Sequence, residues 1–175
     1  DIPNTDTTLF NIASISKQLT AMGIITLQLD GKLSVDDDIR KYLPEMPDFG
    51  HKITIRHLLH HTSGLRDFYS MLSLAGWRQG DPASAEDLFR FIVNQKELNF
   101  NPGEEYLYSN TGYMLMAKII EIVTGENFKD WMHERIFLPL GMKDTYIEDE
   151  STRVVKGNAT SYILQTDKRY QRAVE

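Results

Sequence analysis

The chain contains no cysteine among its 175 residues. Disulfides therefore cannot stabilise the fold, and redox chemistry gives no indication of the compartment. Long hydrophobic runs are also missing, because polar residues interrupt every apolar stretch well before the roughly 18 residues that a membrane-spanning helix needs. Residues 1–6 do not have the pattern of a secretory signal. We therefore expect no membrane span in this chain.

Positive charge is scarce and dispersed along the sequence. Nineteen Lys and Arg residues stand against 25 Asp and Glu residues, which gives a net charge of −6 at pH 7. A nucleic-acid groove or a polybasic membrane anchor requires clustered basic residues. The composition thus excludes those partners and favours a small molecule or a peptide. With 41% hydrophobic residues, the chain has enough apolar material for one compact domain.

Hydrophobic periodicity predicts a mostly helical chain. The first strong helix begins near Ala13, carries apolar residues on several faces and ends at Asp30-Gly31, where glycine can adopt the left-handed cap conformation. We expect this helix to be buried. Further helices are predicted over Asp36–Tyr42, over 55–59 after the cap Thr54, over 85–95 after the cap Ser84, over 112–123, and from Asn127 to Ile136. Residues 66–80 stay ambiguous, whereas 160–164 and 170–174 indicate a weak hairpin around a turn at 165–168.

An S-x-x-K motif lies at the start of the first helix, where Ser14 and Lys17 share one face. Serine needs a neighbouring base to be a good nucleophile, and an apolar pocket disfavours the ammonium form of a lysine, which can then accept the serine proton. The backbone N–H groups at the helix start, including that of Ser14, can face a developing oxyanion. The alternative is a capped helix with a solvated lysine. Lys17 lies at the wrong end for the helix dipole, which favours a functional reason for its position.

A second motif, Tyr108-Ser109-Asn110, follows a Pro-Gly turn and precedes an apolar helix. A tyrosine beside an ammonium group is drawn toward the phenolate form and can carry a proton to a leaving group. An asparagine amide can bind a substrate carbonyl. The alternative is a surface loop in which Ser109 or Asn110 merely caps the following helix.

The two motifs together resemble those of the serine β-lactamase and penicillin-binding protein superfamily, in which S-x-x-K precedes Y-x-N in the class C β-lactamase, D-Ala-D-Ala carboxypeptidase and esterase branch. Residues 10–17, 55–65, 102–103 and 139–142 agree with that branch in the same order. The resemblance implies the family's α+β fold, of which this chain is mostly the helical region with little of the antiparallel sheet. It also implies a location in the periplasm or outside the cell, although the sequence itself leaves the compartment open.

By the same resemblance, Ser14 would be acylated, Lys17 would help to deprotonate it, Tyr108 would pass protons, and Asn110 would hold the amide of the substrate. The implied activity is that of a serine hydrolase that forms an acyl-enzyme with a β-lactam, a D-amino peptide or a small ester, without a cofactor. Two alternatives stay open: a penicillin-binding or sensing module that does not hydrolyse its ligand, and a helical interaction domain without catalysis.

The chain departs from the family pattern after Asn110, because no K-T-G or H-x-G motif follows. The strands that normally precede S-x-x-K are missing too. We interpret residues 1–175 as a single partial catalytic domain whose site lacks one wall. The helix over 12–29 should then be covered by other residues or another chain, or should form an apolar patch that self-associates.

Two residue clusters invite a metal-binding interpretation. His57, His60 and His61 lie near a helix end, but no acid or cysteine stands at ligand spacing on that helix. The run 36–38 of three aspartates lacks the alternating ligands and central glycine of a calcium loop. We therefore expect no metal, and the resemblance implies that the histidines are structural.

Overall fold

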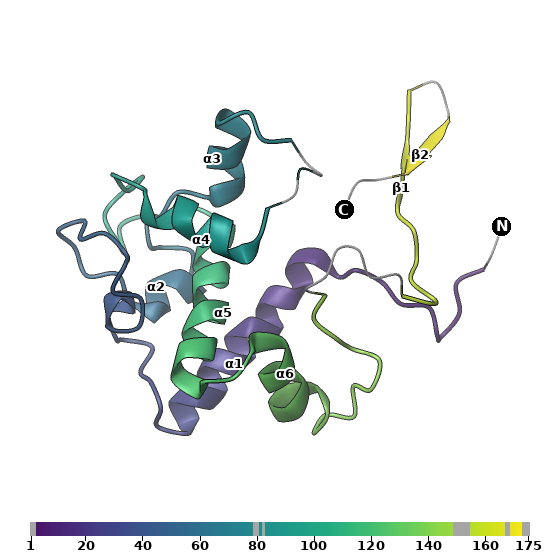
Figure 1. Cartoon of the computed structure of the whole chain (residues 1–175), viewed down its shortest axis with the longest axis horizontal. Coiled ribbons are helices and arrows are strands. Elements are labelled where there is room, and N and C mark those ends of the chain that lie inside the picture. Colours follow the sequence, from purple (N-terminus) through teal and green to yellow (C-terminus); the bar gives the residue numbers. More distant parts are fainter. Residues whose placement is uncertain (1–2, 79–80, 82, 149–154, 167–168, 173–175) are drawn as a thin grey trace.

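The computed structural model describes residues 3–78, 81, 83–148, 155–166 and 169–172, which are mostly helical (Figure 1). In chain order the elements are η1 (Ala13–Ser16), α1 (Lys17–Leu29), η2 (Ile39–Lys41), α2 (Ile55–Leu59), α3 (Phe68–Leu74), α4 (Ala85–Val93), α5 (Asn110–Thr124), α6 (Phe128–Met132), the π-helical turn η3 (His133–Phe137), β1 (Tyr162–Leu164) and β2 (Tyr170–Arg172).

The centre of the molecule is the packing of α1 against α5, with α6 alongside (Figure 1). Ile24 and Leu27 on α1 are completely buried. Gly23 allows the close approach, because a Cβ at this position would lie 3.0 Å from Ile120 Cδ1 on α5 and 3.2 Å from Met132 Sδ on α6. This packing brings the amino-terminal ends of α1 and α5, which carry the two sequence motifs, to the same region.

Several helix boundaries follow from capping residues that the sequence identified. Ser84 Oγ accepts a hydrogen bond from the backbone N–H of Asp87 at 3.1 Å, and Asp87 Oδ2 accepts one from the backbone N–H of Ser84 at 3.2 Å. Thr54 caps α2 in the same reciprocal way. Gly31, with φ of 69°, follows α1 in the predicted left-handed conformation. These caps satisfy backbone donors and acceptors that the helix ends leave unpaired.

Some predicted boundaries were wrong. The helix expected over Asp36–Tyr42 is only the single turn η2, because the N–H of Ile39 donates to the carbonyl of Ile53 at 2.9 Å and Asp38 forms a β-bridge with Thr54. The backbone at Asp38, directly before η2, is therefore extended rather than helical. The helix predicted from 112 starts at Asn110, and the helix predicted from 127 to 136 becomes a π-helical turn after Met132.

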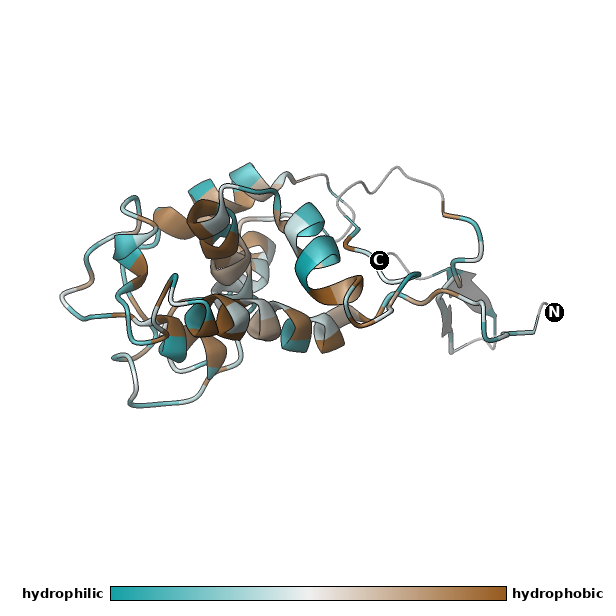
Figure 2. Ribbon diagram, turned by 90° about the horizontal axis from the view of Figure 1, so that it is seen from below, coloured by the Kyte–Doolittle hydropathy of each residue, from teal (hydrophilic) through white to brown (hydrophobic). Residues whose placement is uncertain are grey.

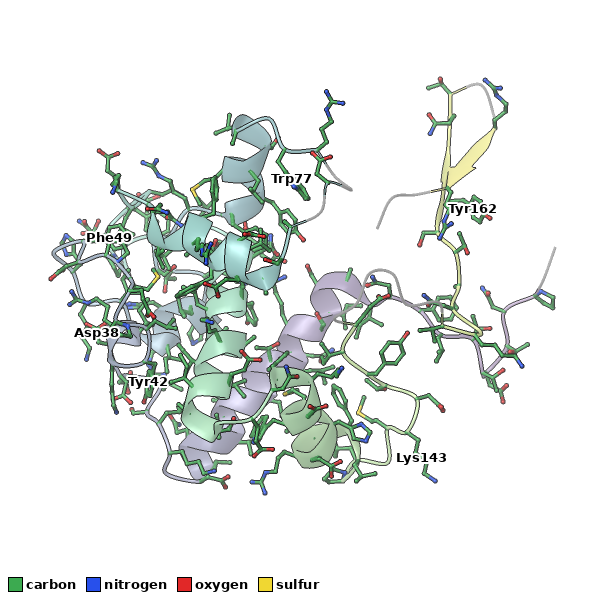
Figure 3. The ribbon with its side chains drawn as sticks, viewed as in Figure 1. Asp38, Tyr42, Phe49, Trp77, Lys143 and Tyr162 are labelled. Atoms are coloured by element: carbon green, nitrogen blue, oxygen red, sulfur yellow. The ribbon has the colours of Figure 1, made fainter. Side chains whose placement is uncertain are left out.

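The two short strands pair in antiparallel fashion, with Tyr162 opposite Arg172, as the predicted hairpin requires. The hairpin stands apart from the helices, and Tyr162 on β1 is exposed (Figures 1 and 3). Parts of the predicted hairpin at 167–168 and 173–174 lie outside the described residues. The ambiguous segment contains α3, and its positions 79–80 also lie outside the described residues.

Hydrophobic residues lie mainly in the helices (Figure 2), yet α1 is not buried on every side. Leu29 is 81% exposed and Ile15 is 63% exposed, while Met22 and Ile25 are partly exposed on the same helical segment. The expectation of a fully buried helix was therefore wrong, since apolar side chains are exposed along this segment, and self-association through them stays a prediction. None of the helices in the described part of the chain combines the length and hydrophobicity that crossing a bilayer requires.

Candidate active site

Ser14 lies in the first turn of η1, directly after a residue with an unusual backbone conformation. Ala13 has φ of 44°, in the left-handed region that costs an L-residue with a Cβ about 1–2 kcal/mol. Asn11 Oδ1 supports this turn by accepting a hydrogen bond from the N–H of Ala13 at 2.8 Å, and Ser16 Oγ donates to the carbonyl of Ala13 at 2.7 Å. Such strained positions cluster at functional sites. Here the turn presents Ser14 at the surface of the described structure.

Lys17 connects the two motifs. Its Nζ donates to Ser14 Oγ at 3.0 Å and to Asn110 Oδ1 at 2.9 Å. The same nitrogen lies 4.9 Å from the ring centroid of Tyr108 and 5.6 Å from that of Tyr113, within range of cation–π attraction. The predicted proximity of Lys17 and Ser14 is confirmed. Lys17 is half-buried, with polar atoms of Ser14 and Asn110 and the two tyrosine rings around its Nζ.

Tyr108 completes a three-way contact around the serine hydroxyl. A hydrogen bond of 2.7 Å joins Tyr108 Oη to Ser14 Oγ. Burial raises the pKa of the Tyr108 hydroxyl, but hydrogen bonding to Lys17 and Ser14 and the positive charge of Lys17 outweigh this effect, so the pKa lies below its ordinary value. The charge of Asp67 opposes the decrease. The phenolate form of Tyr108 is therefore more accessible here than in an isolated tyrosine.

Asn110 is the first residue of α5, and its amide orientation is fixed by its neighbours. Asp67 Oδ2 accepts hydrogen bonds from the backbone N–H of Asn110 at 2.6 Å and from its Nδ2 at 2.9 Å. A carboxylate only accepts and an ammonium only donates, so Asn110 Oδ1 must face Lys17. One hydrogen of Nδ2 remains for another acceptor, such as a substrate carbonyl.

The sequence interpretation missed Asp67 as a part of this region. Asp67 also caps α3, where Oδ1 accepts from the backbone N–H groups of Tyr69 at 3.1 Å and Ser70 at 3.3 Å. An aspartate ahead of the Phe68–Leu74 segment was a capping signal in the sequence. Its contact with Asn110, 43 residues away, had no local signal.

His61 was interpreted only as structural, but it lies against the Tyr108 side of the site. Its ring centroid is 4.6 Å from that of Tyr108, with an angle of 31° between the planes. His61 Nδ1 accepts a hydrogen bond from the backbone N–H of Ser109 at 3.1 Å. His57 has a different role, since its Nδ1 accepts from the N–H of Thr54 at the start of α2. No group of three or more acids and histidines in the described part of the chain is arranged to hold a metal ion.

Comparison with known proteins extends this picture. The family model described as Beta-lactamase matches residues 1–169. Over 140 residues the chain is 42% identical to penicillin-binding protein 4* of Bacillus subtilis strain 168, an alignment that covers 79% of this chain and 30% of that protein. Over 159 residues it is 35% identical to a D-aminopeptidase of Brucella anthropi, covering 86% of this chain and 29% of that protein.

Among solved structures, the D-amino acid amidase of Ochrobactrum anthropi SV3 complexed with L-phenylalanine amide matches with a TM-score of 0.84 and 32% identity. That alignment covers 100% of this chain and 49% of the amidase chain. The chain thus spans less than a third of the two curated relatives and about half of the amidase.

Proposed function

This chain belongs to the β-lactamase family and has its fold, and on that premise we propose that it carries the nucleophile of a serine hydrolase that forms an acyl-enzyme through Ser14. Tyr108 and Lys17 are the proposed catalytic partners, and Asn110 is the proposed substrate-binding residue. The observation that carries the proposal is the contact of one hydroxyl with two activating groups, since Ser14 Oγ lies 2.7 Å from Tyr108 Oη and 3.0 Å from Lys17 Nζ.

The proposed first step transfers the serine proton to Tyr108. In this step the serine hydroxyl donates its hydrogen to Tyr108 Oη across the 2.7 Å contact between the two oxygens, while Lys17 Nζ donates to Ser14 Oγ. Tyr108, held toward the phenolate by the Lys17 charge, accepts this proton while Ser14 Oγ forms a bond to the substrate carbonyl carbon. The carbonyl electron pair moves to its oxygen, and the N–H of Ser14 is the proposed donor to that oxyanion from this chain.

The second step breaks the bond to the leaving group. The oxyanion returns its electron pair to carbon, the C–N bond breaks, and the departing amine takes the proton from Tyr108 Oη. An ester of Ser14 remains. Water then attacks this ester, gives one proton to Tyr108, and releases the acid as Tyr108 returns the proton to Ser14 Oγ. Tyr108 therefore acts as a base in each half-reaction and as an acid when the leaving group departs.

The proposed substrate is a peptide or amide whose acyl group is a D-amino acid. Support comes from relatives named D-aminopeptidase and D-amino acid amidase. The test is hydrolysis of D-phenylalanine p-nitroanilide by the full-length protein, with the L-enantiomer and the Ser14→Ala variant as controls. We expect release of nitroaniline from the D-enantiomer only. Equal rates for Ser14→Ala and the unmodified protein would contradict the proposal.

A second candidate is a penicillin-binding module that is acylated without turnover, and the 42% identity to a protein named penicillin-binding protein 4* favours it over a purely structural role. A fluorescent penicillin distinguishes the two. A label on Ser14 that persists for hours supports the binding module, whereas a label that is lost within minutes supports the hydrolase.

A further inference from the structure

His61 contacts the Tyr-x-Asn segment at three points. Its carbonyl accepts from the N–H of Leu107 at 3.0 Å, its Nδ1 accepts from the N–H of Ser109 at 3.1 Å, and its ring lies against Tyr108. These contacts surround the one residue of the segment whose hydroxyl meets Ser14. A shift of His61 would therefore displace Tyr108 Oη from Ser14 Oγ.

The hydrogen bond from Ser109 fixes the chemical form of the imidazole. A nitrogen can accept a hydrogen bond only while its lone pair is free, so Nδ1 carries no proton and the neutral ring carries its proton on Nε2. Protonation of Nδ1 would remove this hydrogen bond, because the new Nδ1–H would point at the backbone N–H of Ser109. It would also add a positive charge close to Lys17.

We propose that neutral His61 is a positioning residue for Tyr108, and that its protonation releases the Tyr108–Asn110 segment and so limits acylation of Ser14 at acidic pH. The catalytic consequence rests on the function proposed above. The conformational consequence depends only on the contacts of His61 with residues 107–109.

Charged and titratable groups face His61 from several elements. They are Lys17 from α1, His60 on the same segment, Tyr106 and Tyr108 from the loop before α5, and Tyr113 from α5. Burial and then the Lys17 charge lower the pKa of His61 below its ordinary value of 6.5. No carboxylate is among these groups, and the lowered pKa keeps His61 neutral at pH 7, so that the ring becomes charged only in a more acidic solution.

The backbone of His61 suggests matched variants. Its φ of 57° is left-handed, a conformation that asparagine tolerates better than most residues. His61→Asn keeps an acceptor near the Nδ1 position but removes the ring and its titration. His61→Phe keeps a ring but removes the acceptor. His60→Asn changes the exposed neighbouring histidine and is the control.

The experiment follows the side-chain nitrogens of His61, the Ser109 amide and the Tyr108 ring by NMR between pH 4.5 and 8. We expect the Nε2–H tautomer at pH 7.5, and Ser109 and Tyr108 signals that move with the midpoint of His61, below 6.5. His60→Asn should retain this common titration and His61→Asn should abolish it. A proton on Nδ1 at pH 7.5, or Ser109 and Tyr108 signals that ignore His61, would overturn the inference.

Rates of acylation by a fluorescent penicillin add a functional measurement. At pH 7.5 we expect His61→Phe to lower the acylation rate at least about tenfold, because a small displacement of a catalytic group is sufficient for such a loss. His61→Asn should retain more activity at pH 7.5, and its acylation rate should fall less toward pH 5. Identical pH profiles for His61→Asn and the unmodified protein would overturn the catalytic consequence. If penicillin does not acylate the unmodified protein, hydrolysis of D-phenylalanine p-nitroanilide replaces acylation in this comparison. If neither reaction occurs at any pH, the proposed function fails, and the NMR titration alone decides the role of His61.

Discussion

Asp67 Oδ2 accepts hydrogen bonds from both nitrogen atoms of Asn110, the backbone nitrogen at 2.6 Å and Nδ2 at 2.9 Å. This carboxylate joins the start of α3 to the start of α5 and leaves Asn110 Oδ1 to Lys17. Asp67 thus determines which atom of Asn110 meets the lysine, although Asp67 itself contacts neither Ser14 nor Lys17 through a hydrogen bond in the described structure.

Replacement of Asp67 by asparagine tests this relationship. Both oxygens of Asp67 act as acceptors, and an asparagine has only one acceptor atom, so either the α3 cap or the Asn110 contact must be lost. We expect Asp67→Asn to lower the acylation rate of the full-length protein by about 10- to 100-fold. Asp36→Asn is the control, since Asp36 pairs with Arg56 on the exposed surface. Equal rates for both variants would contradict a positioning role of Asp67.

Gly64 is predicted to be the least replaceable glycine near the site. It has φ of 73°, and a Cβ there would lie 2.0 Å from the carbonyl oxygen of Phe100. Gly31 has nearly the same φ, 69°, but no neighbour within 4 Å. Gly31→Ala should therefore cost only about 1–2 kcal/mol of unfolding free energy from left-handed strain, whereas Gly64→Ala should cost more than about 3 kcal/mol or prevent folding. Urea unfolding of both variants measures the difference, and equal costs would show that the collision is relieved.

Asp37 provides a stability contribution that depends on pH. Hydrogen bonds from Tyr42, Lys41 and the N–H of Ser34 lower the pKa of its carboxyl from 3.8 to about 2, on the flank of the molecule where Figure 3 labels Tyr42. Because the pKa in the folded state is depressed, the stabilisation is complete above about pH 5 and is lost as the pH falls toward 2. Asp37→Asn should accordingly be less stable at pH 6, with a deficit that shrinks on acidification. A deficit that is the same at pH 6 and pH 2.5 would be inconsistent with this origin.

The exposed side of α1 is expected to promote self-association of the 175-residue chain. Leu29 is 81% exposed there, and contiguous apolar patches mark sites of association. Leu29→Gln should reduce the fraction of associated species, measured as a lower average sedimentation coefficient, without lowering the free energy of unfolding. Leu74→Gln is the matched control, because Leu74 is 90% exposed on α3 instead. A monodisperse monomer at tens of micromolar for the unmodified chain would contradict this prediction.

Features within one helical turn could be predicted from the sequence, and features that depend on distant segments could not. The capping box of Ser84, the glycine after α1 and the shared face of Ser14 and Lys17 depend on spacings of one to three residues. The helix predicted over residues 36–42 is too long, because pairing with Ile53 and Thr54 determines the backbone conformation there. The contact between Asp67 and Asn110 joins residues that are 43 positions apart, and no local sequence pattern indicates it.

The exposed side of α1 illustrates the same limit. A helix that is apolar on several faces is predicted to be buried, but the sequence does not say which neighbour covers each face. In the described structure α5 packs against α1, where Ile24 and Leu27 are buried, while Leu29 on α1 and Ile15 on the preceding η1 stay exposed. Which apolar side chains stay exposed therefore depends on how many other elements pack against the helix, and the sequence of the helix alone does not contain this information.

The most direct test of the central claim is the mass of the peptide that contains Ser14 after a brief reaction of the full-length protein with a penicillin, stopped by acid. The proposed mechanism predicts that this peptide gains the mass of the intact penicillin, that the gain is absent in Ser14→Ala, and that Ser14→Ala changes stability by no more than about 1 kcal/mol. An equal adduct in the Ser14→Ala variant would contradict a nucleophilic role for Ser14, as would a peptide of unchanged mass in a protein whose Ser14→Ala variant hydrolyses D-phenylalanine p-nitroanilide at the unmodified rate.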